Sequence, residues 1–173
     1  MIRSAKYNPT RPLRKSDNRK SFDCGAEPLD LYLVQYALQN QKKDAARTYV
    51  VVNGEGKIVG YYLLVYGSMT VGETPAEISS GHGKHPVPII LIARLATSID
   101  EHRKGLGRSL VRGALVRSVS AANIAGLSTV IVDATDSNAK AFYEKMGFIP
   151  GPEDEFQLLK KTSDVRSVLS GVG

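Results

Sequence analysis

The sequence predicts an α+β domain in which helices cover the faces of a mixed β-sheet. Residues 47–69 are rich in β-branched and aromatic side chains on both sides of a short turn, which is typical of an antiparallel hairpin. Residues 89–135 follow the order strand, helix, strand, which requires a right-handed crossover and parallel strands. A sheet with both kinds of pairing is mixed, and helices must bury its apolar faces.

In the first half of the chain, residues 22–44 predict a helix. Its apolar side chains recur at i, i+3, i+4 and i+7 from Leu29 to Ala37, so Tyr32 and Tyr36 are expected in the helix core. The hairpin consists of a strand over 47–53, a turn over 54–56 and a strand over 57–69. Residues 72–88 mix Gly, Pro, Ser and His and predict a loop.

The second half begins with a nearly continuous apolar run, as expected for a strand buried on both faces. The second of the two helices predicted in this half begins with capping residues and ends at Gly147. The predicted elements are a strand over 89–98, a helix over 107–123, a strand over 128–135, a helix over 136–147, and short strands over 148–150 and 155–161.

Composition narrows the class of protein. The 173 residues suffice for one domain with a proper core, and 42% hydrophobic with 23% charged residues is ordinary for a soluble protein. No stretch reaches the roughly 18–20 apolar residues of a membrane helix, and the N-terminus lacks a secretory signal. Cys24 is the only cysteine, which excludes a disulfide framework and a cysteine-rich zinc site. We expect a cytoplasmic protein with no membrane contact and no metal.

The net charge of +6 lies in the first twenty residues, which hold seven basic side chains and one acid. We therefore expect residues 1–20 to form a basic arm that belongs to the domain, residues 21–161 to form the domain, and residues 162–173 to form a frayed tail. Such a basic block favours nucleic acid or an acidic partner protein. The alternative is a solvated segment that aids solubility.

The segment "EHRKGLGRSL", residues 101–110, lies where a buried strand hands over to a helix. The first amides of a helix lack internal acceptors and carry the positive end of its dipole, and glycines let an anion approach the backbone. The sequence therefore predicts a phosphate site, with a simple strand–helix turn as the alternative. Leu110 stands where both the P-loop and the dinucleotide pattern require glycine, which argues against both.

The order of elements, with "HRKGLGRSL" and "NAKAFYEKMGF" (138–148), resembles the GCN5-related N-acetyltransferases. In that family the pattern [Q/R]-x-x-G-x-[G/A] binds the pyrophosphate of acetyl-coenzyme A. Gly105 and Gly107 fit this pattern, whereas His102 stands where Gln or Arg is usual. The resemblance implies acetyl-coenzyme A as the acetyl donor. It implies that the cofactor is held by Leu95, Ala96, Thr97, Arg103, Lys104, Gly105, Leu106, Gly107, Arg108, Ser109 and Asn138.

The N-terminal half, with "FDCGAEPLDLYLVQYALQNQ", "ARTYVVV" and "HPVPIILIARLA", resembles the TacT-type acetyltransferase toxins of bacterial toxin–antitoxin pairs. This resemblance implies acetylation of the α-amino group of aminoacyl-tRNA, a block in translation, a ribbon-helix-helix antitoxin and a homodimer. A basic arm independently suits a tRNA substrate. The alternatives are an acetyltransferase for a small-molecule or protein amine, and a non-catalytic module that binds nucleic acid or an antitoxin.

Tyr143, within the second motif, is the predicted catalytic residue. Its phenol could donate a hydrogen bond or a proton to the departing sulfur. The alternative is an aromatic side chain that packs in the core, as we expect for Phe142. No dedicated base is required, because an α-amino group titrates near about 7.7–8.0 and is partly neutral at cellular pH.

Other polar residues carry weaker signals. Arg47, Arg94 and Lys140 flank the predicted site and are candidates for contacts with tRNA phosphates, although surface placement alone also explains them. The three histidines lack a helical metal-binding spacing, which favours a solvated role for them. Cys24 is expected to be a small buried residue.

Overall fold

The computed structural model describes residues 7–171, and residues 1–6 and 172–173 lie outside the description. The chain forms two compact units. Of the described residues, unit 1 comprises 7–64 and 94–114, and unit 2 comprises 65–93 and 115–171. The strands are β1 (Arg11–Pro12), β2 (Arg47–Val52), β3 (Ile58–Met69), β4 (Val87–Thr97), β5 (Thr129–Asp133), β6 (Ile149–Pro150) and β7 (Gln157–Lys161). Their order in the sheet is β1-β2-β3-β4-β5-β7-β6. Three elements contribute residues to both units: β3 (Ile58–Met69), β4 (Val87–Thr97) and α4 (Leu106–Ala122).

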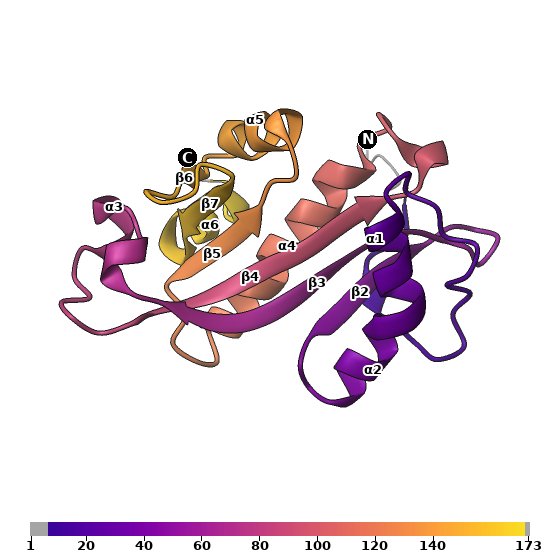
Figure 1. The fold of residues 1–173 in the computed structure, drawn as a ribbon, viewed down its shortest axis with the longest axis horizontal. Coiled ribbons are helices and arrows are strands. Elements are labelled where there is room, and N and C mark those ends of the chain that lie inside the picture. The colour runs from indigo at the N-terminus through magenta and orange to yellow at the C-terminus, as the bar shows by residue number, and fades with distance from the viewer. Residues whose placement is uncertain (1–6, 172–173) are drawn as a thin grey trace. The chain divides into compact units, whose positions relative to one another are not determined.

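Unit 1 holds the predicted N-terminal helix and the predicted hairpin (Figure 1). Its other elements are β1 (Arg11–Pro12), α1 (Glu27–Leu31), the π-helical turn η1 (Tyr32–Tyr36), α2 (Ala37–Lys42), β2 (Arg47–Val52) and the 3₁₀ turn η3 (Ile99–Glu101). The helix therefore runs from Glu27 to Lys42. It is shorter than the predicted 22–44 at its start because Pro28 occupies the first turn, where a proline opens a helix.

The π-helical turn changes which side chains of this helix face the core. A turn with one extra residue shifts the spacing of the positions that follow it. Tyr32, Leu33 and Ala37 are buried, as the spacing predicts, but Tyr36 is 48% exposed. The rings of Tyr32 and Tyr36 stack with centroids 6.3 Å apart. The prediction that Tyr36 belongs to the helix core is therefore wrong, whereas that for Tyr32 is confirmed.

Two consecutive tyrosines of β3 show how helices cover both faces of the sheet in unit 1. β2 and β3 pair antiparallel, as predicted, with an irregularity between Val51 and Val52. The Tyr61 hydroxyl donates to the carbonyl of Leu29 in α1 at 2.6 Å. Tyr62 points to the opposite face, where its hydroxyl lies beside Gly113 of α4. Alternation along the strand thus places α1 on one face and the first half of α4 on the other.

The described part of the basic arm, residues 7–20, packs on unit 1. Leu13 is buried, and its amide donates to the carbonyl of Thr48 at 2.9 Å. The Arg11 guanidinium holds the Asp17 carboxylate with two nitrogen–oxygen distances of 2.9 and 2.7 Å. Arg19 donates to a carbonyl of the π-helical turn at 2.9 Å. The described arm is therefore anchored at Arg11, Leu13 and Arg19, while Arg14, Lys15 and Lys20 keep exposed side chains.

Unit 2 contains the parallel pairing that the strand–helix–strand order predicts. Ile89–Ile92 of β4 pair in parallel with Thr129–Val132 of β5. β7 pairs antiparallel with both β5 and β6. The elements that lie wholly in unit 2 are η2 (Val71–Glu73), α3 (Ala76–Ser79), β5 (Thr129–Asp133), α5 (Ser137–Lys145), β6 (Ile149–Pro150), β7 (Gln157–Lys161) and α6 (Thr162–Leu169).

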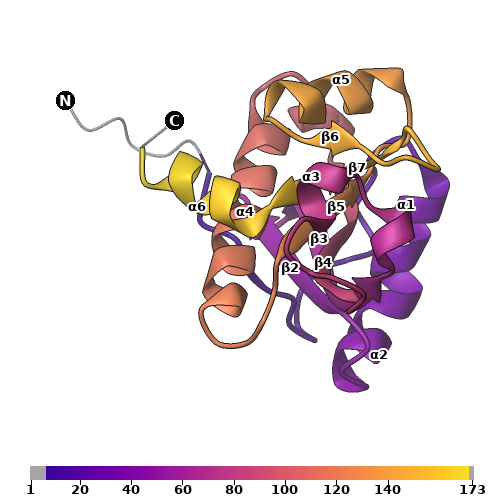
Figure 2. The same cartoon turned by 90° about the vertical axis from the view of Figure 1, so that its left-hand side faces the viewer.

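Two segments of unit 2 are more regular than predicted. The expected loop over 72–88 contains part of η2 and the whole of α3, whose Ile78 is buried (Figure 2). The expected frayed tail is wrong for Thr162–Leu169, which form α6. The side chain of Val165 is fully buried, and the amide of Thr162 donates to the carbonyl of Ser128 at 2.9 Å. One buried apolar side chain and one backbone anchor hold this polar helix in place.

The apolar core of unit 2 gathers side chains from α3 and from four strands. Its buried members are Met69, Ile78, Val87, Ile89, Ile131 and Leu159. Among residues 7–171, no helix is both long enough and apolar enough to cross a lipid bilayer.

Candidate functional site

The predicted phosphate loop connects η3 to the start of α4 in unit 1. Arg103 and Gly105 both have positive φ angles, 63° and 86°, so the chain turns through the left-handed region twice. Leu106, which is 1% exposed, anchors the first turn of α4 in the core. The side chains of Arg103, Lys104 and Arg108 are exposed and form no ion pair or hydrogen bond with the described residues.

The backbone of this loop has the features of an anion site. The first helical hydrogen bond runs from the amide of Ser109 to the carbonyl of Gly105 at 3.2 Å. The amides of Leu106, Gly107 and Arg108 therefore have no acceptor within the helix, and they lie at the positive end of the helix dipole. A Cβ atom on Gly105 or Gly107 would have no atom within 4 Å, so the space outside both residues is open.

The two glycines differ in what the backbone requires of them. Gly105 needs its positive φ, whereas Gly107 lies in α4 without one. Glycine in a helix interior is destabilising relative to alanine by roughly 0.5–1 kcal/mol. The turn alternative explains Gly105 but gives no reason for Gly107. An anion that must approach the Gly107 amide closely does give one.

His102 links this loop to the end of β4. Its Nε2 atom lies 3.0 Å from the carbonyl oxygen of Thr97. The contact joins the first position of the motif to the last residue of the predicted pantetheine-binding strand segment. Spacing in the sequence gives no sign of this pairing, so the sequence analysis missed it.

The arm also reaches the loop. The Tyr7 hydroxyl donates to the Glu101 carboxylate at 2.7 Å. Burial, followed by this hydrogen bond, raises the pKa of Tyr7 to about 12. The carboxylate of Glu101 is therefore engaged by the arm rather than by the neighbouring cations Arg103 and Lys104.

The predicted pantetheine-binding residues Leu95, Ala96 and Thr97 form the last residues of β4. Ala96 is buried, and Leu95 and Thr97 are half-buried. In the register of the described residues, the parallel pairing with β5 covers Ile89–Ile92, so Leu95–Thr97 continue beyond the paired segment. Backbone groups past the end of a ladder require other partners, which an extended ligand can supply.

Tyr143 lies in α5 of unit 2, and its ring is 7% exposed. It makes edge-to-face contacts with Phe142 and Phe148, at centroid distances of 5.4 and 5.7 Å. Phe142, predicted to pack in the core, is only half-buried, and Tyr143 is the more deeply buried of the two. The Tyr143 hydroxyl makes no hydrogen bond with the described residues.

The ends of α5 are fixed by polar contacts. Asp136 caps its start by accepting from the amide of Ala139 at 2.8 Å, which confirms the predicted cap. Gly147, with φ 90°, follows its end. The buried Lys160 donates from Nζ to the carbonyl of Met146 at 2.7 Å. A cation at a helix C-terminus is favoured by the helix dipole, so Lys160 stabilises the helix that carries Tyr143.

Asp133, at the end of β5, is a candidate that the sequence analysis missed. Burial raises the pKa of Tyr143 to about 12, and the charge of Asp133 acts in the same direction. Desolvation also raises the pKa of Asp133 itself, against a hydrogen bond from Gln157, its partner in β7. An acid that directly follows the buried run "STVIV" is the signal that could have identified it.

The three candidates for tRNA contact all have partners within the protein. The Arg94 guanidinium lies 4.6 Å above the centre of the Tyr32 ring. Arg47 pairs with Asp44 at 3.0 Å, and Lys140 pairs with Glu155 at 3.2 Å. Each cation retains hydrogen-bond donors beyond these contacts, since guanidinium and ammonium groups carry several.

Asn138 and Cys24 are the remaining predicted positions, and neither has a charged side chain. Asn138 is exposed in the first turn of α5. Cys24 is buried, as predicted, and burial raises the pKa of its thiol to about 11. Among the described residues, no group of three or more His, Cys, Asp or Glu side chains could hold a metal ion.

Comparison with known proteins identifies the fold and the family. Residues 44–150 match the family described as the acetyltransferase (GNAT) domain. The chain belongs to this family. A tRNA-acetylating toxin of Mycobacterium tuberculosis (strain ATCC 25618 / H37Rv) is 34% identical over 163 residues, which cover 94% of this chain and 97% of that protein. Both expectations, the mixed α+β sheet and the N-acetyltransferase family, are therefore confirmed.

Solved GNAT structures resemble the chain along most of its length. AtaT complexed with acetyl-methionyl-tRNAfMet has a TM-score of 0.84 at 25% identity, covering 92% of this chain and 98% of that one. AtaTR bound with AcCoA has a TM-score of 0.77 at 26% identity, covering 92% and 96%. The KacTA–DNA complex has a TM-score of 0.78 at 25% identity, covering 94% and 98%.

Proposed function

We propose that this GNAT protein is a toxin that transfers an acetyl group from acetyl-coenzyme A to the α-amino group of aminoacyl-tRNA. The observation that carries this proposal is the 34% identity, over almost the full length of both chains, to a protein named a tRNA-acetylating toxin. The anion-binding geometry of the loop before α4 agrees with a pyrophosphate-bearing donor. Acetylation removes the amine that peptide-bond formation needs, so translation stops.

In the proposed cofactor site, each set of residues holds a different part of acetyl-coenzyme A. The amides at the start of α4 and the cations Arg103, Lys104 and Arg108 bind the pyrophosphate. The backbone of Leu95–Thr97 pairs with the pantetheine arm. Asn138 supplies a polar contact from its exposed place in α5.

The chemistry is attack of a neutral amine on a thioester. The nitrogen forms a bond with the acetyl carbon, the carbon–sulfur bond breaks, and the amine loses one proton. Because an α-amino group has a pKa near about 7.7–8.0, a sizeable fraction is neutral without a dedicated base. The departing sulfur carries the negative charge, so catalysis requires a hydrogen-bond donor there.

Tyr143 is the proposed donor to that sulfur. Its pKa of about 12 keeps the phenol protonated at neutral pH. Complete transfer of its proton to a thiolate is unfavourable, because the raised pKa of the phenol lies well above the value near about 8.5 of an ordinary thiol. Tyr143 therefore stabilises the thiolate through a hydrogen bond, and solvent completes the protonation.

We also propose the setting in which this activity operates. A toxin of this kind requires a neutralising partner, which the resemblance to the TacT type identifies as a ribbon-helix-helix antitoxin. Its tRNA substrate implies the cytoplasm, and a homodimer follows from the same resemblance. Arg47, Arg94 and Lys140 remain the proposed contacts to tRNA phosphates.

The deciding experiment uses radiolabelled acetyl-coenzyme A with aminoacylated and uncharged tRNA. We expect label on the aminoacylated tRNA alone, and mild alkaline hydrolysis of the ester should release it as an N-acetyl amino acid. Equal labelling of both tRNAs, or of neither, would refute the tRNA assignment. Efficient labelling of free amines instead would favour the small-molecule alternative. Calorimetry that detects no affinity for acetyl-coenzyme A would favour the non-catalytic binding module.

A further inference from the structure

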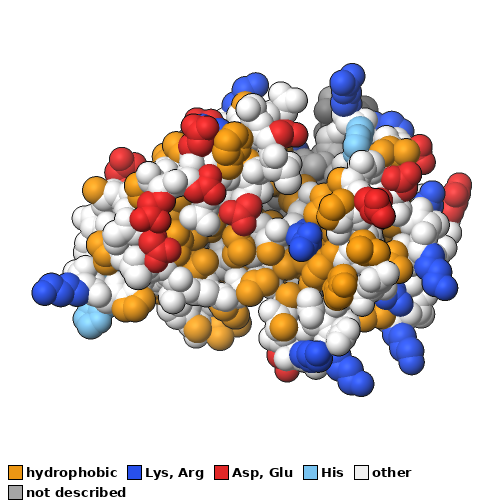
Figure 3. All heavy atoms as spheres, viewed as in Figure 1, with side chains coloured by type: hydrophobic (Ala, Val, Ile, Leu, Met, Phe, Trp, Pro, Cys, Tyr) orange, Lys and Arg blue, Asp and Glu red, His pale blue; other side chains and the backbone are white. Residues whose placement is uncertain are grey.

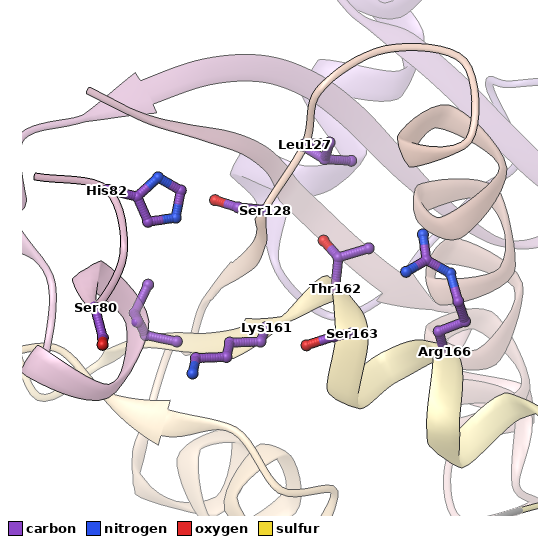
Figure 4. A pocket seen from close by; sticks show the side chains of 9 residues that line it. Ser80, His82, Leu127, Ser128, Lys161, Thr162, Ser163 and Arg166 are labelled. Carbon is purple, nitrogen blue, oxygen red and sulfur yellow. The ribbon is translucent and has the colours of Figure 1, made fainter. Parts of the chain in front are cut away.

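Unit 2 contains a cavity of about 290 Å³ that plays no part in the proposed reaction (Figure 4). It is lined by the segment after α3, the approach to β5 and the start of α6. Pockets that enclose whole small molecules measure about 300–1,000 Å³. This cavity therefore suits a small ligand or one group of a larger ligand.

One residue that lines the cavity carries a buried hydroxyl without a hydrogen-bond partner among the described residues. Thr162 is the first residue of α6 and is 3% exposed, and its Oγ1 atom has no hydrogen-bond partner among the described residues. Its amide is already used, because it donates to the carbonyl of Ser128. Figure 4 shows the Thr162 hydroxyl directed away from α6, on the side of Ser128. Buried polar groups are nearly always paired, so an unpaired one points to a missing partner.

The groups around Thr162 are cationic or are hydrogen-bond donors. Lys161 and Arg166 both line the cavity, and no acidic residue does. The Lys161 side chain makes no hydrogen bond or ion pair with the described residues, and Arg166 uses only Nη2, which donates to Asn123 at 3.2 Å. His82 and the hydroxyls of Ser80, Ser128 and Ser163 also line the cavity, and the Ser128 hydroxyl already donates to the carbonyl of Pro88. The nearest acid in sequence, Asp164, is exposed and is not part of the lining.

The backbone at the start of α6 adds partial positive charge to that of Lys161 and Arg166. α6 has eight residues and no side-chain cap at its start, so the first-turn amides of Ser163 and Asp164 lack a capping acceptor. The helix dipole places partial positive charge at the same point. Cations, a dipole, two hydroxyls and free amides together match an anion with several acceptor oxygens.

We propose that this cavity binds a phosphate group. The chemistry is the same for a phosphate of the RNA backbone and for a free phosphate, and the experiment below distinguishes these two sources. The inference stands apart from acetyl transfer, because none of its residues belongs to the proposed cofactor site.

The first measurement titrates inorganic phosphate into the full-length protein at constant ionic strength, with chloride as the matched anion. The imidazole proton signal of His82, assigned with His82→Gln, reports on binding. We expect a saturable shift with phosphate only. Lys161→Gln and Arg166→Gln should each weaken binding at least tenfold, and Thr162→Val, which keeps the shape of the side chain, should weaken it several-fold. Lys145→Gln, an exposed lysine outside the cavity, should change nothing.

The second measurement is the affinity for uncharged tRNA, which does not require catalysis. If an RNA phosphate occupies the cavity, Lys161→Gln and Arg166→Gln weaken RNA binding about five- to tenfold more than Lys145→Gln does, and inorganic phosphate competes. If only the phosphate titration responds to these variants, the occupant is a free phosphate. No saturable shift together with equal RNA affinities would overturn the proposal. Failure of tRNA acetylation alone would leave both measurements unaffected.

Discussion

At Tyr143, burial and the neighbouring charge of Asp133 act on the phenol in the same direction. Both disfavour the phenolate, so the residue is held as a proton-bearing donor. Its ring also packs against Phe142 and Phe148, so this side chain has a structural role beside the chemical role that we propose for it. Removing only the hydroxyl separates the two roles, because a phenylalanine ring preserves the aromatic contacts.

Tyr143→Phe should therefore fold normally and lose most of its activity. We expect acetylation of aminoacyl-tRNA to slow by about 10²- to 10⁴-fold, the usual contribution of a positioned acid. Affinity for acetyl-coenzyme A, measured by calorimetry, should change less than about twofold, since a hydrogen bond made mainly to the departing sulfur adds little to ground-state binding. A variant that still turns over near the wild-type rate would exclude a catalytic role for the hydroxyl.

Asp133→Asn should lower the pKa of Tyr143. The substitution removes a negative charge that disfavours the phenolate and leaves burial, the larger cause, in place. The phenol pKa should then lie between its ordinary value and that in the wild type. Carbon-13 NMR of ring-labelled tyrosine follows this titration, and Tyr143→Phe assigns the signal. Asp164→Asn, on exposed α6, is the control; an unchanged Tyr143 pKa in Asp133→Asn would contradict the coupling.

At the scale of the element, two glycines of the loop before α4 allow the effect of backbone strain to be distinguished from the effect of ligand contact. Gly105→Ala places a side chain at φ 86° and should cost about 1–2 kcal/mol of stability. Gly107→Ala meets no neighbour and should be neutral or stabilising by up to about 1 kcal/mol. Both should bind acetyl-coenzyme A more weakly, because a methyl group would cover the helix amides. Urea unfolding and calorimetry check the pair. Wild-type affinity in Gly107→Ala would argue for a turn without a ligand.

The C-terminus of α5 depends on one buried amine. Lys160→Met removes the donor to the Met146 carbonyl and leaves that carbonyl without its partner. We expect a loss of about 1–3 kcal/mol in the free energy of unfolding, measured by urea denaturation. Lys145→Met, in the exposed last turn of the same helix, should cost less than about 0.5 kcal/mol. Equal losses in the two variants would show that Lys160 acts only through its side-chain packing.

At the scale of the whole molecule, the excess positive charge should govern affinity for RNA. Arg11 is neutralised by Asp17, but Lys15 and Lys20 remain exposed in the arm. Lys and Arg side chains project over the unit 1 elements on the face seen in Figure 3. Lys15→Gln/Lys20→Gln should weaken tRNA binding and reduce the slope of log K against log salt by up to about 2. The matched pair Lys84→Gln/Lys145→Gln, which lies outside the arm, should leave the slope nearly unchanged.

Local patterns predicted most elements of this fold. The hairpin, the parallel β4–β5 pair and the capped helix α5 each carry a periodic or capping signal within one short segment. Two helices that sequence analysis missed, α3 and α6, are short or polar, and each buries one apolar side chain, Ile78 or Val165. Such anchoring is decided by tertiary packing, which periodicity does not report.

In the candidate site, too, local patterns identify residues that are adjacent in the sequence and miss contacts between residues that are far apart. The glycines and cations of the loop are contiguous in the sequence, so one pattern identifies them together. The pairs Tyr7–Glu101 and Arg94–Tyr32 join residues that are distant in the chain, and no spacing rule relates them. The hydroxyl of Thr162 attracts notice only once its burial without a partner is known.

The hydrogen bond from Tyr7 to Glu101 has a practical consequence for protein production. An affinity tag placed upstream of Tyr7 is joined to a residue that is anchored on the turn leading into the proposed cofactor loop. We expect an acidic tag there to compete with the pyrophosphate of the proposed donor for the exposed cations of that loop, and so to lower the measured acetylation rate of an intact protein. Activity assays and crystallisation should therefore use protein whose N-terminal tag has been cleaved, and the cleaved and uncleaved forms provide a direct comparison.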